Sequence, residues 1–140
     1  MPERTILADT GPLVAALNAR DHWHAWAVGQ FKLLPAPLLT CEPVLTEAFH
    51  LLSRTDNGPQ QFFELLSRGV IAVDFKLTDL TKPLERLVHK YRDLPMSLAD
   101  ACLVRLSEIH PNASVLTLDG HFRIYRKHRR QVIPLLIPDK

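Results

Sequence analysis

The sequence is poor in the features that mark disulfide-stabilised, membrane-spanning and nucleotide-binding proteins. Its 140 residues include two cysteines and five glycines. Cys41 and Cys102 lie in apolar stretches without a partner at metal-ligand spacing, which favours two buried thiols in a reducing cytoplasm over a disulfide framework. No glycine-rich loop of the phosphate-binding type is present. The longest uncharged runs are far shorter than the ~20 residues that span a bilayer, so no membrane segment is expected.

A strong net charge is also missing. The 17 lysines and arginines nearly balance the 15 aspartates and glutamates. The net charge of +2 therefore does not by itself indicate a nucleic-acid-binding protein. The N-terminus, MPERTILADT, lacks a basic region followed by a long apolar stretch, so export is not expected. The length suits one domain, spanning residues 1–140, around a single core.

Short apolar runs alternate with helical patterns along the chain. The runs predict strands over residues 4–9, 37–40, 69–75, 114–119 and 131–137. The helical spacing of apolar residues predicts helices over residues 13–19, 22–34, 42–54, 60–68, 79–93 and 97–109, with a basic helix over 121–128. Pro83 is tolerable in a first helical turn or marks a later start at Thr81, and Pro134 confines the last strand to a sheet edge. The alternation indicates an α/β sandwich with a mostly parallel sheet.

Four carboxylates fall where a parallel sheet would gather them. Asp9 closes the run RTILAD, and Asp119 closes the run SVLTLD. If these two strands are neighbours, about 4.8 Å apart, their acids face one volume at the carboxyl edge of the sheet, where ligands bind in such folds. Asp100 stands in the first turn of its helix, and Glu47 borders the buried face of its own helix.

Each acid also has an ordinary structural explanation. Asp9 can cap the helix that follows it, Asp100 fits a capping box, and Asp119 fits a turn. Glu47 can be a boundary residue. Together, however, several like charges in a partly apolar hollow persist only if protons or a cation neutralise them. An all-oxygen ligand set selects Mg²⁺ or Mn²⁺, and such a cluster can orient water for attack on a phosphodiester.

Setting these four acids aside changes the charge balance. The 17 basic residues then face 11 acidic ones, a surplus of +6. Much of the surplus lies in RIYRKHRR, residues 123–130, directly after Asp119. We expect this segment to be either a basic flank for an RNA phosphate backbone or a solvated terminal helix.

Four segments, in this order, resemble the motifs of PIN-domain ribonucleases, and specifically of the VapC toxins of toxin–antitoxin modules. They are LADTGPLVAALNARDHWH, EPVLTEAFHLL, PMSLADACLV and VLTLDGHFRIYR. The last two are the most specific in their spacing. The resemblance implies a metal site made of Asp9, Glu47, Asp100 and Asp119.

The resemblance also implies the rest of the biochemistry. It implies a three-layer α/β/α fold, Mg²⁺- or Mn²⁺-dependent endoribonuclease activity on RNA, a homodimer, and inhibition by a small antitoxin whose tail enters the active-site groove. Thr10 and Thr117 correspond to hydroxyl positions that often line this family's site, and a purely structural role stays open for both. Many relatives carry a further acid near the counterpart of Asp100 or Asp119, so a second ion is expected to bind weakly or only with RNA.

The leading prediction is a ribonuclease in which a metal-bound water attacks phosphorus and leaves 5′-phosphate and 3′-hydroxyl ends. One alternative is a PIN-like scaffold that binds RNA or protein without cutting. The other is an aspartate-based phosphoryl-transfer domain, although the first strand ends in Asp9-Thr10-Gly11 without a D-x-D pair and no suitably placed lysine follows SVLTLD. The exposed-looking helix containing QQFFELL is a plausible contact between subunits.

Overall fold

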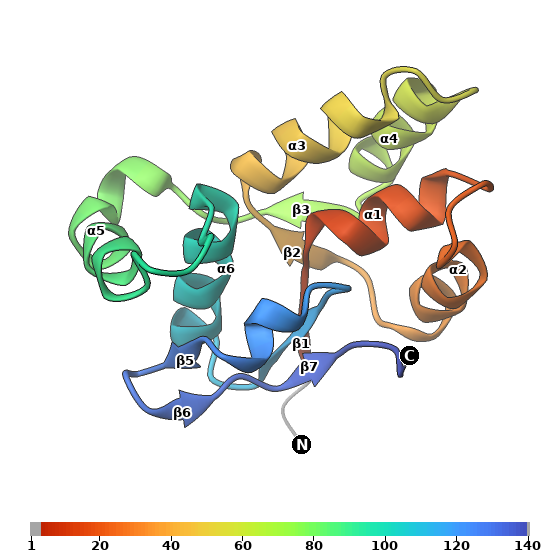
Figure 1. The fold of residues 1–140 in the computed structure, drawn as a ribbon. Helices are drawn as coiled ribbons and strands as arrows, with labels where there is room; N and C mark the ends of the chain where they lie inside the picture. The colour runs from red at the N-terminus through yellow and green to blue at the C-terminus, as the bar shows by residue number, and fades with distance from the viewer. Residues whose placement is uncertain (1–3, 140) are drawn as a thin grey trace.

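The fold is built on a parallel sheet, seen in a computed structural model that describes residues 4–139 (Figure 1). Within that range the central sheet has five strands in the order β3-β2-β1-β4-β7, and every pairing is parallel. The strands are β1 (Thr5–Ala8), β2 (Leu38–Thr40), β3 (Ile71–Val73), β4 (Ala113–Leu116) and β7 (Leu135–Leu136). The expected mostly parallel sheet is therefore confirmed.

Helices connect the strands and cover both faces of the sheet. They are α1 (Thr10–Leu17), α2 (His24–Leu33), α3 (Glu42–Leu52), α4 (Gly58–Ser67), α5 (Thr81–Lys90) and α6 (Leu98–Ile109), with 3₁₀ turns η1 (Leu77–Asp79) and η2 (Gly120–Arg123). The chain moves from β1 to β2 to β3 in one direction and then crosses back to β4. Because such crossovers are right-handed, α1–α4 lie on one face and α5–α6 on the other, as Figure 1 shows.

The core lies between these layers, and α6 contributes the largest share of it. Leu103, Val104 and Cys102 of α6 are fully buried, because this helix packs against α5 on one side and the sheet on the other. Cys41 is buried as well, and neither cysteine forms a disulfide, as the sequence predicted. No helix within residues 4–139 combines the length and the apolar character needed to cross a membrane.

The basic helix expected over 121–128 is wrong. After the single turn of η2 the chain forms β5 (Arg126–Lys127), which pairs antiparallel with β6 (Gln131–Val132). Phe122 and Tyr125 are fully buried, but the residues from 126 to 131 carry no apolar side chain. A helix continued through them would have no apolar face to pack, and packing supplies most of the stability of short helices.

The last strand, expected over 131–137, is split in two. Gln131–Val132 belongs to the small hairpin, whereas Leu135–Leu136 joins the edge of the main sheet beside β4. Pro134 separates the two pieces; it has no N–H to donate, but its carbonyl accepts a hydrogen bond from the Val115 N–H at 2.9 Å. The expected edge position of this proline is confirmed.

Candidate active site

The candidate site lies where the strand order reverses, between β1 and β4. These strands are neighbours in parallel register, with Ala8 opposite Leu116. The Asp9 N–H continues the ladder by donating to the Leu116 carbonyl at 3.0 Å. Asp9 and the turn that carries Asp119 therefore leave the sheet side by side at its carboxyl edge, where parallel α/β folds bind ligands.

A hollow of about 400 Å³ opens at this edge. All four predicted acids line it, although they come from four different parts of the chain. The full lining is Asp9, Thr10, Gly11, Glu47, Leu51, Pro95, Ser97, Asp100, Leu118 and Asp119. The structure thus brings the four carboxylates around one space instead of leaving each in its own local environment.

Asp9 is one of the two buried acids of the four. Its residue is 7 % exposed; its Oδ1 accepts a hydrogen bond from the Thr10 N–H at 2.8 Å, and its Oδ2 accepts one from Thr117 Oγ1 at 2.7 Å. Burial raises the pKa of Asp9 to about 6; the two hydrogen bonds oppose this rise, and the nearby charges of Asp100 and Asp119 add to it. Asp9 thus caps helix α1 and has a carboxyl group whose pKa is raised.

Asp100 closes the hollow from the N-terminal turn of α6. The predicted capping box is present: Asp100 N–H donates to Ser97 Oγ at 3.0 Å, and Asp100 Oδ2 accepts from the Ser97 N–H at 3.3 Å. The same Oδ2 accepts a hydrogen bond from the Tyr125 hydroxyl at 3.0 Å. Burial raises the pKa of Asp100; these hydrogen bonds lower it, and Asp119 raises it further. The capping box is therefore confirmed, and the capping carboxylate also lines the hollow.

Asp119 lies at the rim and is more exposed. It caps η2 by accepting the His121 N–H at 2.9 Å, and the same Oδ1 lies 2.8 Å from His121 Nδ1. The Thr117 hydroxyl, which donates to Asp9, also accepts the Asp119 N–H at 2.9 Å. One threonine therefore links the backbone of the rim acid to the buried carboxylate.

Glu47 faces the hollow from α3 and is exposed. Its Oε2 lies 3.5 Å from Thr10 Oγ1, at the outer limit of a hydrogen bond. Its long side chain is free of any shorter hydrogen bond within residues 4–139. This acid is the one that can change position most easily.

The donor set of the hollow fits a hard divalent cation by chemistry, since all four groups are carboxylates. In the described part of the chain, however, no three acidic, histidine or cysteine side chains form a preformed ligand group. The hydrogen bonds explain this arrangement, because Thr117, Tyr125 and His121 each hold a different aspartate. For all four carboxylates to bind one ion, Glu47 and Asp119 at the rim would have to turn toward Asp9 and Asp100.

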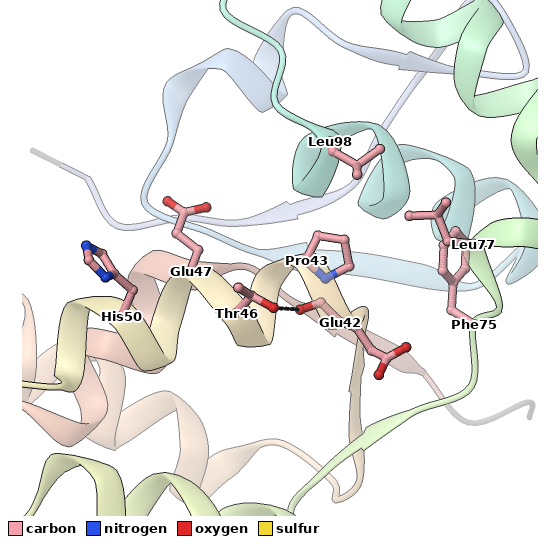
Figure 2. Close-up of a pocket in the computed structure, with 8 residues that line it drawn as sticks. All are labelled: Glu42, Pro43, Thr46, Glu47, His50, Phe75, Leu77 and Leu98. Carbon is pink, nitrogen blue, oxygen red and sulfur yellow. Dashed lines mark hydrogen bonds between the residues drawn. The ribbon is translucent and has the colours of Figure 1, made fainter.

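A second, more apolar hollow of about 690 Å³ adjoins the first and shares Glu47 with it (Figure 2). In Figure 2, Leu98 of α6 faces Pro43 of α3, with Leu77 and Phe75 at one end and Glu47 and His50 of α3 at the other. We call this hollow the apolar groove. The two hollows meet at Glu47, so a chain lying in the apolar groove would reach that carboxylate.

Sequence reasoning missed Tyr125. Its ring is fully buried against Tyr91 and Phe122, and its hydroxyl reaches Asp100 across 25 positions of sequence. The charge of Asp100 and the burial together raise the pKa of Tyr125 above its ordinary value, so it stays a hydrogen-bond donor. Within RIYRKHRR the tyrosine carries no signal of this contact, because the contact depends on the turn after η2.

A parallel sheet with helices on both faces is the three-layer α/β/α architecture expected of a PIN-like domain. The solved structure of Mycobacterium tuberculosis VapC20, a sarcin-ricin loop cleaving toxin, is similar to this chain with a TM-score of 0.74. The similarity covers 83 % of this chain and 91 % of VapC20 at 22 % sequence identity. At that identity it shows the fold, which is the one that the motif resemblance implied.

Comparisons of sequence alone are negative. No family model matches the chain. No curated protein sequence matches it either. The assignment of an activity therefore depends on the residues of the site.

Proposed function

We propose that this protein is a Mg²⁺- or Mn²⁺-dependent endoribonuclease that acts in the cytoplasm as the toxin of a toxin–antitoxin module. The whole chain would serve as a single nuclease domain, with Asp9, Glu47, Asp100 and Asp119 as metal ligands. The observation that carries the proposal is that these four acids, spread over more than 100 positions, line one hollow at the switch point of the sheet.

Each acid has a defined part in the proposed reaction. Asp9 and Asp100 are the fixed ligands, because Thr117 and Tyr125 hold their carboxylates in place. Glu47 and Asp119 complete the set from the rim. When bound, the divalent ion supplies positive charge against the phosphate and activates water for hydrolysis.

The substrate class follows from the charge and from the structural similarity. A hollow lined by carboxylates repels a phosphodiester unless a cation lies between them, which accounts for metal dependence. VapC20 is described as cleaving the sarcin-ricin loop. We therefore infer a structured RNA loop as the substrate, and a sarcin-ricin type stem-loop is the first RNA to test.

The partners follow from two apolar surfaces. We propose that the tail of an antitoxin lies in the apolar groove and reaches Glu47. We also propose a homodimer formed through α3 and α4, where Phe49, Phe63 and Leu51 are between 37 % and 58 % exposed. Light scattering on the purified protein tests the dimer, and a Phe63→Glu variant should be monomeric.

The direct test is cleavage of the stem-loop with Mg²⁺, with EDTA, and with Mg²⁺ and the Asp100→Asn variant. The proposal expects products with 5′-phosphate and 3′-hydroxyl ends in the first reaction alone. Equal cleavage by Asp100→Asn would contradict the assignment.

A second candidate is a PIN-like scaffold that binds RNA or a protein without cutting it. The absence of a preformed ligand group among the described residues favours this alternative. RNA binding that is unaffected by Mg²⁺, with no cleavage of any RNA tested, would support it over the nuclease.

A further inference from the structure

The hairpin part of the basic segment, residues 126–132, does not flank the acidic hollow, although Tyr125 just before it contacts Asp100. The β5–β6 hairpin lies at the far end of α6, as Figure 1 shows. Its turn is tied there by the His128 N–H, which donates to Glu108 Oε2 at 2.7 Å, and by Lys127 Nζ, which lies 3.4 Å from the Pro111 carbonyl. Asp100 and Glu108 are eight positions apart on α6, or about 12 Å along its axis. The hairpin is thus separate from the proposed site of cleavage.

A second basic element meets the hairpin at this end. Lys90, in the last turn of α5, donates from Nζ to the Arg129 carbonyl at 2.8 Å. Arg86 lies one turn earlier on the same exposed face of α5. Arg129 and Arg130 project from the tip of the hairpin, and all four side chains are exposed. We call this set, Arg86, Lys90, Arg129 and Arg130, the cationic corner.

The charges of the cationic corner are not neutralised within the protein. Among residues 4–139 the ion pairs are Arg68–Glu64, Arg105–Glu108 and His121–Asp119, and none involves the corner. Glu108, the nearest acid tied to the hairpin, is already engaged with Arg105 and with the backbone of the turn. The three arginines are therefore available to an external anion, and Lys90 keeps its charge while its Nζ donates to the Arg129 carbonyl and lies 5.2 Å from the centre of the Tyr91 ring.

The backbone of the hairpin tip is held in a costly conformation. His128 has φ 47° and Arg129 has φ 73°, in the left-handed region that favours glycine. Two consecutive non-glycine residues in this region are a local conflict between sequence and structure, and such conflicts concentrate at functional sites. A glycine at position 129 would relax the turn but would remove one of the arginines. An arginine at position 129, where glycine would fit the backbone better, thus indicates that the Arg129 side chain has a use.

We propose that the cationic corner binds the phosphate backbone of structured RNA at a distance from the acidic hollow. The inference builds on the proposed function, because it assigns the corner to the same substrate. Exposed arginine and lysine side chains on two neighbouring elements suit a phosphate backbone, which presents a regular row of negative charges. The corner would hold the stem of an RNA whose loop lies at the carboxylates.

The test compares Arg129→Gln/Arg130→Gln with a control of equal charge, Arg20→Gln/Lys32→Gln, both exposed and distant from the hairpin in sequence. Two RNA probes are used. One is a stem-loop with a stem of about 30 Å, and the other is a single strand too short to extend from the acidic hollow to the cationic corner. Fluorescence anisotropy with Mg²⁺, on uncleavable analogues of both RNAs that keep the backbone charge, gives Kd over a range of salt concentrations, so binding is measured without cleavage.

The Arg129→Gln/Arg130→Gln variant is expected to weaken stem-loop binding about tenfold and to reduce the salt dependence of log K by about 2, since two phosphate contacts are lost. Binding of the short strand and of the control variant should stay within about twofold of wild type. With Mg²⁺ the KM for the stem-loop should rise, while kcat on the short strand stays unchanged.

Two further variants separate binding from folding. Arg129→Lys/Arg130→Lys should restore most of the stem-loop affinity, because the charge returns. Arg129→Gly should raise Tm, by relaxing the turn, and still weaken stem-loop binding. A merely structural role for Arg129 would give no loss of RNA binding with Arg129→Gly.

Three results would overturn the proposal: equal losses in the hairpin variant and the control, equal losses on both RNAs, or unchanged RNA binding with loss of binding to an acidic antitoxin peptide. A wild-type protein that binds the stem-loop through the corner but never cleaves RNA would instead contradict the proposed function while supporting the corner.

Discussion

Asp9 and Asp100 line the same hollow as Glu47 and Asp119, but the two pairs differ in burial and in how firmly they are held. The first two are each 7 % exposed, and each accepts hydrogen bonds from a backbone N–H and from a buried hydroxyl. Glu47 is exposed, and its one contact with Thr10 is long. The buried pair is therefore fixed before any ligand arrives, and at the rim Glu47 can adjust, whereas His121 holds Asp119.

This difference shows where the protein accepts a cost in stability. A buried carboxylate loses hydration, which is why the pKa of Asp9 rises to about 6. A purely structural cap would not need burial of this kind, because an exposed cap performs the same role. The burial of Asp9 and Asp100 thus supports the proposal that they bind a ligand. In that proposal the rim acids complete the coordination when the ligand binds.

The largest expected effect is the loss of cleavage on neutralising a buried acid. Asp9→Asn and Asp100→Asn should each lower the Mg²⁺-dependent rate by about 10³-fold or more, since metal-derived stabilisation is worth several kcal/mol. Single-turnover cleavage of the stem-loop measures it. Asp93→Asn, an exposed acid outside the hollow, is the matched control and should retain the wild-type rate.

The second effect concerns stability and its pH dependence without metal. The pKa of Asp9 is raised from 3.8 to about 6, so the folded state favours its protonated form. The stability from this group is present below about pH 4 and is lost as pH rises through 6, a loss of about 3 kcal/mol by neutral pH.

Asp9→Asn should therefore raise Tm at pH 8 in EDTA by about 10 °C and flatten the fall in stability between pH 4 and 7. Thermal denaturation of both proteins across this range measures the effect. A lower Tm for Asp9→Asn at pH 8 would show that the Asp9 carboxylate stabilises the fold. It would contradict the view that burying this acid costs stability.

The third effect tests whether Tyr125 holds Asp100 in place. Tyr125→Phe removes the hydroxyl that donates to Asp100 Oδ2 but keeps the buried ring. We expect Mn²⁺ affinity, measured by calorimetry, to fall about 10- to 100-fold, as for other groups that orient metal ligands. Tyr91→Phe also removes a hydroxyl, one that accepts a partly buried hydrogen bond from the Arg126 N–H and not from or to an acid, and it should leave the affinity unchanged.

The smallest effect is expected at the rim. Glu47→Gln should lower the cleavage rate about tenfold and change stability by less than about 0.5 kcal/mol, because the side chain is exposed and weakly bonded. Glu42→Gln, on the same helix but outside the acidic hollow, should change neither. A loss at Glu47 as large as that at Asp9 would remove the distinction between the two pairs.

The parts of the fold that follow from local pattern could be predicted. The runs ending in Asp9 and Asp119 are short, apolar and closed by an acid, so their strands and their meeting at one sheet edge follow from general rules of parallel sheets. The acid in the first turn of α6 was readable as a cap from Ser97 alone. These features depend on residues close in sequence or on topology.

The parts that depend on a few long-range contacts could not be predicted. RIYRKHRR has the composition of a solvated helix, but the chain turns because Tyr125 packs under Asp100 and Glu108 holds the tip of the hairpin. The expected basic flank therefore moved to the other end of α6. No local pattern contains either contact, since each joins residues about 20 positions or more apart.

The most direct test of the account is a crystal of the protein soaked in Mn²⁺ and measured at a wavelength where manganese scatters anomalously. The account predicts an anomalous peak in the acidic hollow, within coordination distance of carboxylate oxygens of both Asp9 and Asp100, that disappears in Asp9→Asn. A peak only at other surface acids, or no peak with Mn²⁺ in excess, would contradict it.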